Sequence, residues 1–154
     1  MDFEAEKKLA IKLFNDCWSL IDQPSRTDAE NAEMLHLAHT SRWHWGNVGG
    51  AVEKSVGEWQ CSRVNALLGN GPAALLHAKQ SREFIEEIPA PHFMYASSTE
   101  ALAFANFVLG NLDEAKALKQ EALANLEGLD EEDAAHIRKQ IKWVVRDSNP
   151  RPGD

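Results

Sequence analysis

The hexapeptide NALLGN at residues 65–70 recurs as NFVLGN at residues 106–111, and this pair decides the fold. The offset is 106 minus 65, or 41 residues, and the same register places Ala74 over Ala115. Each copy ends an apolar segment with a glycine, which is typical of a helix C-terminus. A unit of helix, glycine turn and helix that recurs at a fixed spacing indicates helix pairs that bury their faces on their neighbours.

The second copy continues as GNLDEA at residues 110–115, with Ala122 two turns later. This segment resembles the turn of tetratricopeptide repeats, in which a glycine closes the first helix and a small residue early in the second allows close packing. The resemblance covers residues 51–127, and residues 36–64 resemble uncharacterised bacterial proteins of tetratricopeptide-like (TPR-like) fold. It implies stacked antiparallel helix pairs in a right-handed superhelix, with protein or peptide binding in the hollow lined by the first helix of each pair.

Apolar residues at helical spacing, interrupted by glycine and proline, predict an all-α fold of about seven helices. Thr27 and Glu30 have the spacing of a capping box at the start of the second helix. The fifth helix has two candidate starts, near Pro91 or at a second capping box from Ser97 to Glu100. In chain order, the expected helices cover residues 10–21, 27–45, 52–68, 72–88, 91–109, 112–126 and 134–145.

The chain of 154 residues is long enough for one domain with a sizeable core. We expect residues 1–147 to form a single TPR-like domain. Within it, residues 1–48 form an N-terminal helical hairpin, residues 51–127 two repeat-like helix pairs and residues 130–146 a C-terminal capping helix. Residues 148–154 are expected to be a flexible tail, since they combine prolines with a glycine.

Charge and composition exclude several classes of function. The net charge of −8 comes from 24 acidic and 16 basic side chains, and no segment collects the cations that a nucleic-acid surface needs. No apolar stretch approaches the length that spans a membrane, and the N-terminal residues are acidic where a signal peptide is basic. We therefore expect a cytoplasmic protein with no nucleic-acid or membrane partner and no resident cofactor. Cys17 and Cys61 are expected to be reduced, buried thiols.

Residues 36–63 break the pattern of the rest of the chain. The segment contains three of the six histidines and three of the five tryptophans, and it carries a net charge of +1. Trp59 and Arg63 stand four residues apart on one helix, so the guanidinium can lie over the indole in a cation–π contact. The 41-residue offset places Glu100 opposite Trp59, where its carboxylate can face Arg63.

We interpret these residues as a non-catalytic binding or scaffold module. It would hold a peptide segment or a small anionic ligand in a pocket between the second, third and fifth helices. The expected contacts are His36, His39, Arg42, Trp43, Trp59, Arg63 and Glu100. The alternative is structural: backbone carbonyls and glutamates satisfy the polar side chains, and the tryptophans fill helix interfaces.

Two further alternatives stay open. Glu33, His36 and His39 follow one another at three-residue steps, so a metal-dependent, hydrolase-like enzyme could use them as ligands. No second Glu-x-x-His on a matching helix supports that site, and we do not favour a metal. Self-association into a homodimer could instead use Trp18, Trp143 or the open ends of the helix stack.

Overall fold

A computed structural model describes the backbone of residues 1–146 and the side chains of residues 1–141. The expected tail and the Trp143 side chain lie outside this part. Residues 1–146 form seven helices and no strand, which confirms the all-α fold class. The helices are α1 (Phe3–Ile21), α2 (Asp28–Val48), α3 (Ala51–Leu67), α4 (Gly71–Ile85), α5 (Phe93–Val108), α6 (Leu112–Ala124) and α7 (Glu131–Arg146).

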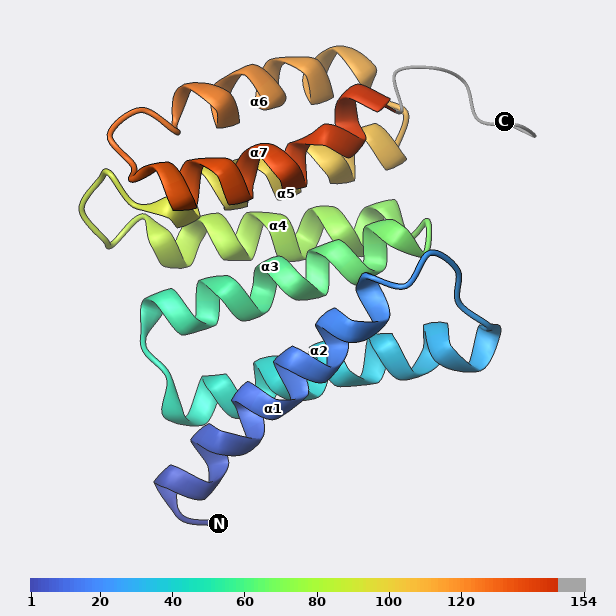
Figure 1. The fold of residues 1–154 in the computed structure, drawn as a ribbon, viewed down its shortest axis with the longest axis vertical. Helices are drawn as coiled ribbons and strands as arrows, with labels where there is room; N and C mark the ends of the chain where they lie inside the picture. Colours follow the sequence, from blue (N-terminus) through green and yellow to red (C-terminus); the bar gives the residue numbers. More distant parts are fainter. Residues whose placement is uncertain (147–154) are drawn as a thin grey trace.

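Helices α2 to α6 follow one another along the long axis of the molecule, whereas α1 crosses α2 and α7 packs on α5 (Figure 1). Each helix packs against the next one in the chain, and in addition α1 contacts α3, α3 contacts α5 and α5 contacts α7. Within residues 1–146 the backbones of the even-numbered helices α2, α4 and α6 do not approach one another, and these helices meet only through long side chains such as Arg82 of α4 and Glu121 of α6. The odd-numbered helices therefore form one continuous layer, which we call the odd-helix layer. The right-handed superhelix and the tetratricopeptide family stay predictions.

The two copies of the repeated hexapeptide form the same turn. Gly69 and Gly110 have φ values of +80° and +84°, a conformation that costs glycine nothing because it has no Cβ. In each copy the glycine N–H donates to the carbonyl three residues earlier at 3.0 Å. The next residue, an asparagine, donates its N–H to the carbonyl five residues earlier at 2.8 Å. These bonds satisfy the last carbonyls of α3 and α5, so the sequence repeat is a structural repeat of the helix end.

Helix starts follow from local hydrogen bonds. The capping box that begins α2 is confirmed: the Thr27 N–H donates to Glu30 Oε1 at 3.0 Å, and the Glu30 N–H donates to Thr27 Oγ1 at 3.1 Å. Helix α5 begins at Phe93, close to the earlier of its two predicted starts. Ser97 and Glu100 therefore lie inside α5 as buried residues and do not cap it.

The core consists of several clusters along the stack. Ala66, Ala74 and Ala105 bring α3, α4 and α5 close together in one of them. Cys17 and Cys61 belong to another, between α1, α2 and α3, and both are buried and free. The expectation of reduced, packed thiols is confirmed. Small side chains at these contacts allow the close helix approach that a stack requires.

Candidate functional site

Helices α3 and α5 carry an unusual number of buried polar side chains. A buried polar group needs a hydrogen-bond partner, and several of these side chains find it on a neighbouring helix, which constrains how the central helices pack. Gln60 donates to the Phe14 carbonyl of α1, whereas Ser55 and Ser62 donate to carbonyls of α4. The set is Ser55, Glu58, Gln60, Ser62 and Asn65 on α3, and Ser97, Ser98, Thr99, Glu100 and Asn106 on α5.

Arg63 and Glu100 form an ion pair between α3 and α5. Arg63 Nη1 lies 2.6 Å from Glu100 Oε1, and the Glu100 residue is 1% exposed. The guanidinium carbon lies 5.9 Å from the centroid of the Trp59 ring and 5.1 Å from that of Phe104. These distances confirm two predictions: that the Arg63 guanidinium lies over the Trp59 indole, and that the Glu100 carboxylate faces Arg63. The positive charge is thus held between two rings and balanced by a buried carboxylate.

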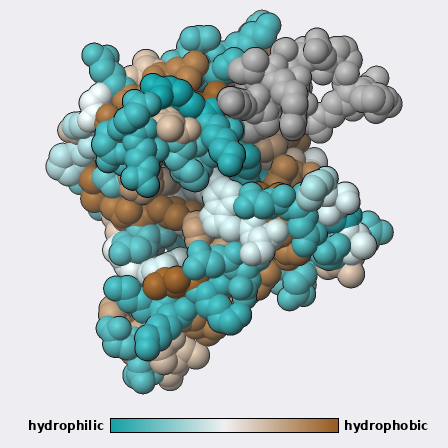
Figure 2. Space-filling view, in the orientation of Figure 1, coloured by the Kyte–Doolittle hydropathy of each residue, from teal (hydrophilic) through white to brown (hydrophobic). Residues whose placement is uncertain are grey.

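A cavity of about 460 Å³ lies beside this pair, and all four helices of the odd-helix layer contribute to its wall. Trp18 of α1 stacks on Trp59 of α3, with ring centroids 5.5 Å apart and planes inclined by 30°. The space-filling view shows hydrophilic side chains over most of one face, with hydrophobic ones in strips among them (Figure 2). The residues that line the cavity are Phe14, Trp18, Asp22, Val56, Trp59, Arg63, Phe93, Met94, Ser97, His136, Lys139 and Gln140. We call it the odd-helix cavity.

Trp59 and Gln140, which both line the odd-helix cavity, each have a buried polar atom that makes no hydrogen bond within the described part of the chain. These atoms are the indole Nε1 of Trp59 and the amide Oε1 of Gln140. The other end of the Gln140 amide is used, since Nε2 donates to His136 Nε2 at 3.0 Å. Trp59 and Gln140 thus contribute one unused donor and one unused acceptor to the wall.

The predicted residues of α2 lie elsewhere. Trp43 is 69% exposed, and none of the residues that line the odd-helix cavity comes from α2. Two shallow hollows of about 410 and 380 Å³ lie along α2 instead. Leu35, His36, His39, Thr40 and Trp43 line the first, and His39, Arg42, Trp43, Gly46 and Asn47 line the second. The structure thus divides the seven predicted residues: four lie along α2, and Trp59, Arg63 and Glu100 lie at or beside the odd-helix cavity.

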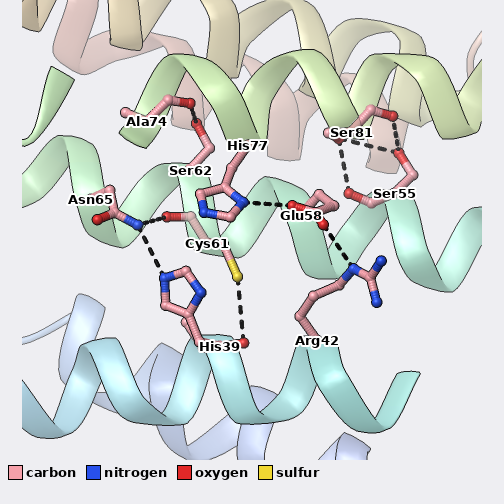
Figure 3. A network of polar contacts seen from close by, with 11 residues as sticks. His39, Arg42, Ser55, Glu58, Cys61, Ser62, Asn65, Ala74, His77 and Ser81 are labelled. Atoms are coloured by element: carbon pink, nitrogen blue, oxygen red, sulfur yellow. Dashed lines mark hydrogen bonds and ion pairs between the residues drawn. The ribbon is translucent and has the colours of Figure 1, made fainter. Parts of the chain in front are cut away.

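A polar cluster joins α2, α3 and α4 (Figure 3). The carboxylate of Glu58 lies at its centre, with Arg42 Nε 2.9 Å from Oε1 and His77 Nδ1 2.7 Å from Oε2. Asn65 Nδ2 donates to His39 Nε2 at 3.2 Å, and the rings of His39 and His77 meet edge to face at 5.0 Å. Since the backbones of α2 and α4 do not approach each other, the side chains of this cluster are what link the two helices across α3.

The electrostatics of the cluster do not favour a reactive or anion-binding role. Burial lowers the pKa of His39 below its ordinary value of 6.5, His77 and His36 lower it further, and Glu58 opposes them. Burial is also the main cause that raises the pKa of the Cys61 thiol. A neutral imidazole attracts an anion weakly, and a protonated thiol is a poor nucleophile. The cluster is best explained as a structural link.

The three candidate metal ligands do not converge. Glu33 and His36 are exposed on α2, whereas His39 is half-buried and bonded to Asn65. Among the described residues, no group of three or more histidine, cysteine, aspartate or glutamate side chains is arranged to hold a metal ion. The geometry gives the metal-dependent alternative no assembled ligand set.

Several residues in the wall of the odd-helix cavity were not predicted from the sequence. Phe14 and Trp18 are one helical turn apart on α1 and meet edge to face, so their spacing in the sequence is a signal that could have placed both on one face. Met94 comes from α5, and His136 and Gln140 come from α7, which has no counterpart in the 41-residue repeat. Their approach to Trp59 depends on the contacts between odd-numbered helices, which no local pattern reveals.

Comparison with known protein families, curated proteins and solved structures returns no match for this chain. Over the helices that the structure describes, none is both long and apolar enough to cross a membrane. The candidate site therefore has to be interpreted from its own geometry.

Proposed function

We propose that this protein is a non-catalytic binding module that holds a short peptide segment of a partner protein in the odd-helix cavity. The observation that carries the proposal is the aromatic wall, in which Trp18 stacks on Trp59 beside a cavity of about 460 Å³. Ligand sites typically measure about 300 to 1,000 Å³ and combine apolar walls with a few polar groups. Residues from four helices build this wall, so the intact fold is needed to form it.

The charges favour a peptide over a small anion. Glu100 balances the charge of Arg63 at 2.6 Å, so the guanidinium is not an uncompensated cation that needs a phosphate or carboxylate. Lys139 is exposed, and Asp22, also exposed, opposes it in sign. An apolar side chain gains more from this wall than an anion does.

The energetics favour a segment over a single small group. Burying one large apolar side chain contributes about 1.5 to 3 kcal/mol, whereas association costs at least about 4 kcal/mol. The anchor therefore needs further contacts from neighbouring residues of the same ligand. A peptide provides such contacts along the odd-helix layer, and the expected affinity is that of a transient interaction, with Kd near the micromolar range.

Selection from a display library of random twelve-residue peptides on the immobilised full chain tests the proposal. Enriched peptides should share an apolar residue, and Val56→Trp, which places a large side chain in the cavity, should weaken them at least tenfold. Trp43→Ala, on α2 and outside the set of residues that line the cavity, is the matched control and should leave their affinity unchanged. Peptides that tolerate Val56→Trp but are lost with Trp43→Ala would place the binding site on α2, and a library that yields no binder would contradict the proposal.

A further inference from the structure

The two unused polar atoms of the odd-helix cavity are opposite in kind. Trp59 is 3% exposed and its indole nitrogen is a donor only, whereas Gln140 is 9% exposed and its amide oxygen is an acceptor only. Neither atom has a hydrogen-bond partner in the described part of the chain. In the orientation that the structure gives the Gln140 amide, with His136 Nε2 as the acceptor, Nε2 donates to His136 and the amide oxygen is left over.

Unused buried groups destabilise the free protein. Each one lowers the folding equilibrium constant by about five- to 150-fold compared with a satisfied group. Both atoms are screened from solvent, so bulk water does not satisfy them. Native proteins contain few buried polar groups without a hydrogen bond. In the wall of a cavity, a ligand that forms the missing hydrogen bonds explains their presence.

The chemistry of the pair selects the ligand. Satisfying both atoms requires an acceptor for Trp59 and a donor for Gln140. A hydrocarbon chain has neither group, and an ionised carboxylate or phosphate has only acceptors. The amide group has both.

We propose that the ligand is a peptide that places an apolar side chain against Trp18 and Trp59 and uses its backbone at both polar atoms. A backbone carbonyl accepts from the Trp59 indole N–H, and a backbone N–H donates to Gln140 Oε1. This inference rests on the proposed function and specifies how the same cavity recognises its ligand. Since both atoms are covered in the free protein, the indole and the Gln140 amide move when the ligand binds.

Two small probes with the same ring test this inference on the unmodified chain. N-acetyl-phenylalaninamide has the aromatic ring with amide groups, and ethylbenzene has the ring alone. Titration of ¹⁵N-labelled protein reports the indole N–H signals of the five tryptophans, of which Trp59 is assigned through Trp59→Phe and Trp43 serves as the exposed reference. One hydrogen bond changes affinity about two- to twelvefold, so the amide probe should bind about five- to 150-fold more tightly than ethylbenzene.

The amide probe should shift the Trp59 indole signal and leave that of Trp43 in place. Gln140→Met keeps the length of the side chain and removes the acceptor, so it should weaken the amide probe about two- to twelvefold and leave ethylbenzene unaffected. Equal binding of both probes, or indifference of the amide probe to Gln140→Met, would overturn this inference and leave cavity binding intact. If the amide probe shifts no signal from the cavity wall at millimolar concentration, this inference fails as well, whereas the proposed function is decided separately by the library selection.

Discussion

Replacing Glu58 by alanine tests whether the polar cluster links α2 to α4. The Glu58 carboxylate is buried and pairs with Arg42 Nε at 2.9 Å and with His77 Nδ1 at 2.7 Å. With its amide nitrogen turned toward Glu58, Gln80 donates as well, at 3.0 Å. The substitution leaves all three groups without their acceptor.

The magnitude follows from burial. Breaking a fully buried ion pair costs about 3 to 5 kcal/mol. The Arg42 and His77 side chains are about one fifth exposed, and water can therefore rehydrate part of each group. We expect Glu58→Ala to lower the free energy of unfolding by about 2 to 4 kcal/mol, which corresponds to a fall in Tm of about 4 to 16 °C for a chain of this size.

Urea unfolding followed by tryptophan fluorescence measures this loss, with an unchanged dependence on urea as the sign that two-state unfolding persists. The matched control is Asp16→Ala, which removes a 2.5 Å ion pair with Lys12 on the exposed surface of α1. We expect that pair to contribute less than about 0.5 kcal/mol, because exposed pairs are screened by water. A loss for Glu58→Ala no larger than the loss for Asp16→Ala would refute the role of the cluster.

Three further predictions concern pH, thiols and turns. Burial lowers the pKa of His39 in the folded state, so as pH falls the unfolded chain binds a proton at this histidine before the folded chain does. The free energy of unfolding should therefore decrease as pH drops through 6.5. Urea unfolding at several pH values measures this decrease, and His39→Gln should make it smaller. Burial raises the pKa of Cys17 to about 12 and also raises that of Cys61, so neither thiol should react with a disulfide reagent in the native protein, and both should react after unfolding. Gly110→Ala should cost about 1 to 2 kcal/mol because φ is +84°, whereas Gly50→Ala, at φ −90°, should cost less than about 0.5 kcal/mol; thermal unfolding of both variants checks this.

Much of the fold was predictable because it depends on local chemistry. The turns at Gly69 and Gly110 and the Thr27 capping box require specific residues at fixed spacings, and both appear as predicted. The start of α5 was harder to predict. His92 accepts a hydrogen bond from the Met94 N–H there, and histidine is not among the residues that usually occupy a helix N-cap.

The candidate site was only partly predictable. The 41-residue offset placed Glu100 opposite Trp59 because both belong to the repeat. It gave no information on layers, however, so Trp43 and Trp59 were expected in one pocket although they lie on helices of different layers. Contacts from Trp18 and Gln140 depend on how α1 and α7 close the ends of the odd-helix layer, and this is a property of tertiary packing.

Methionine methyl signals test the central claim most directly. The chain has three methionines: Met94 lines the odd-helix cavity, Met34 is buried in the cluster between α1, α2 and α3, and Met1 is exposed. In protein labelled with ¹³C at the methionine methyls, a peptide obtained from the library selection should shift the Met94 signal and leave those of Met34 and Met1 in place. A bound peptide that leaves the Met94 signal unmoved would contradict the account.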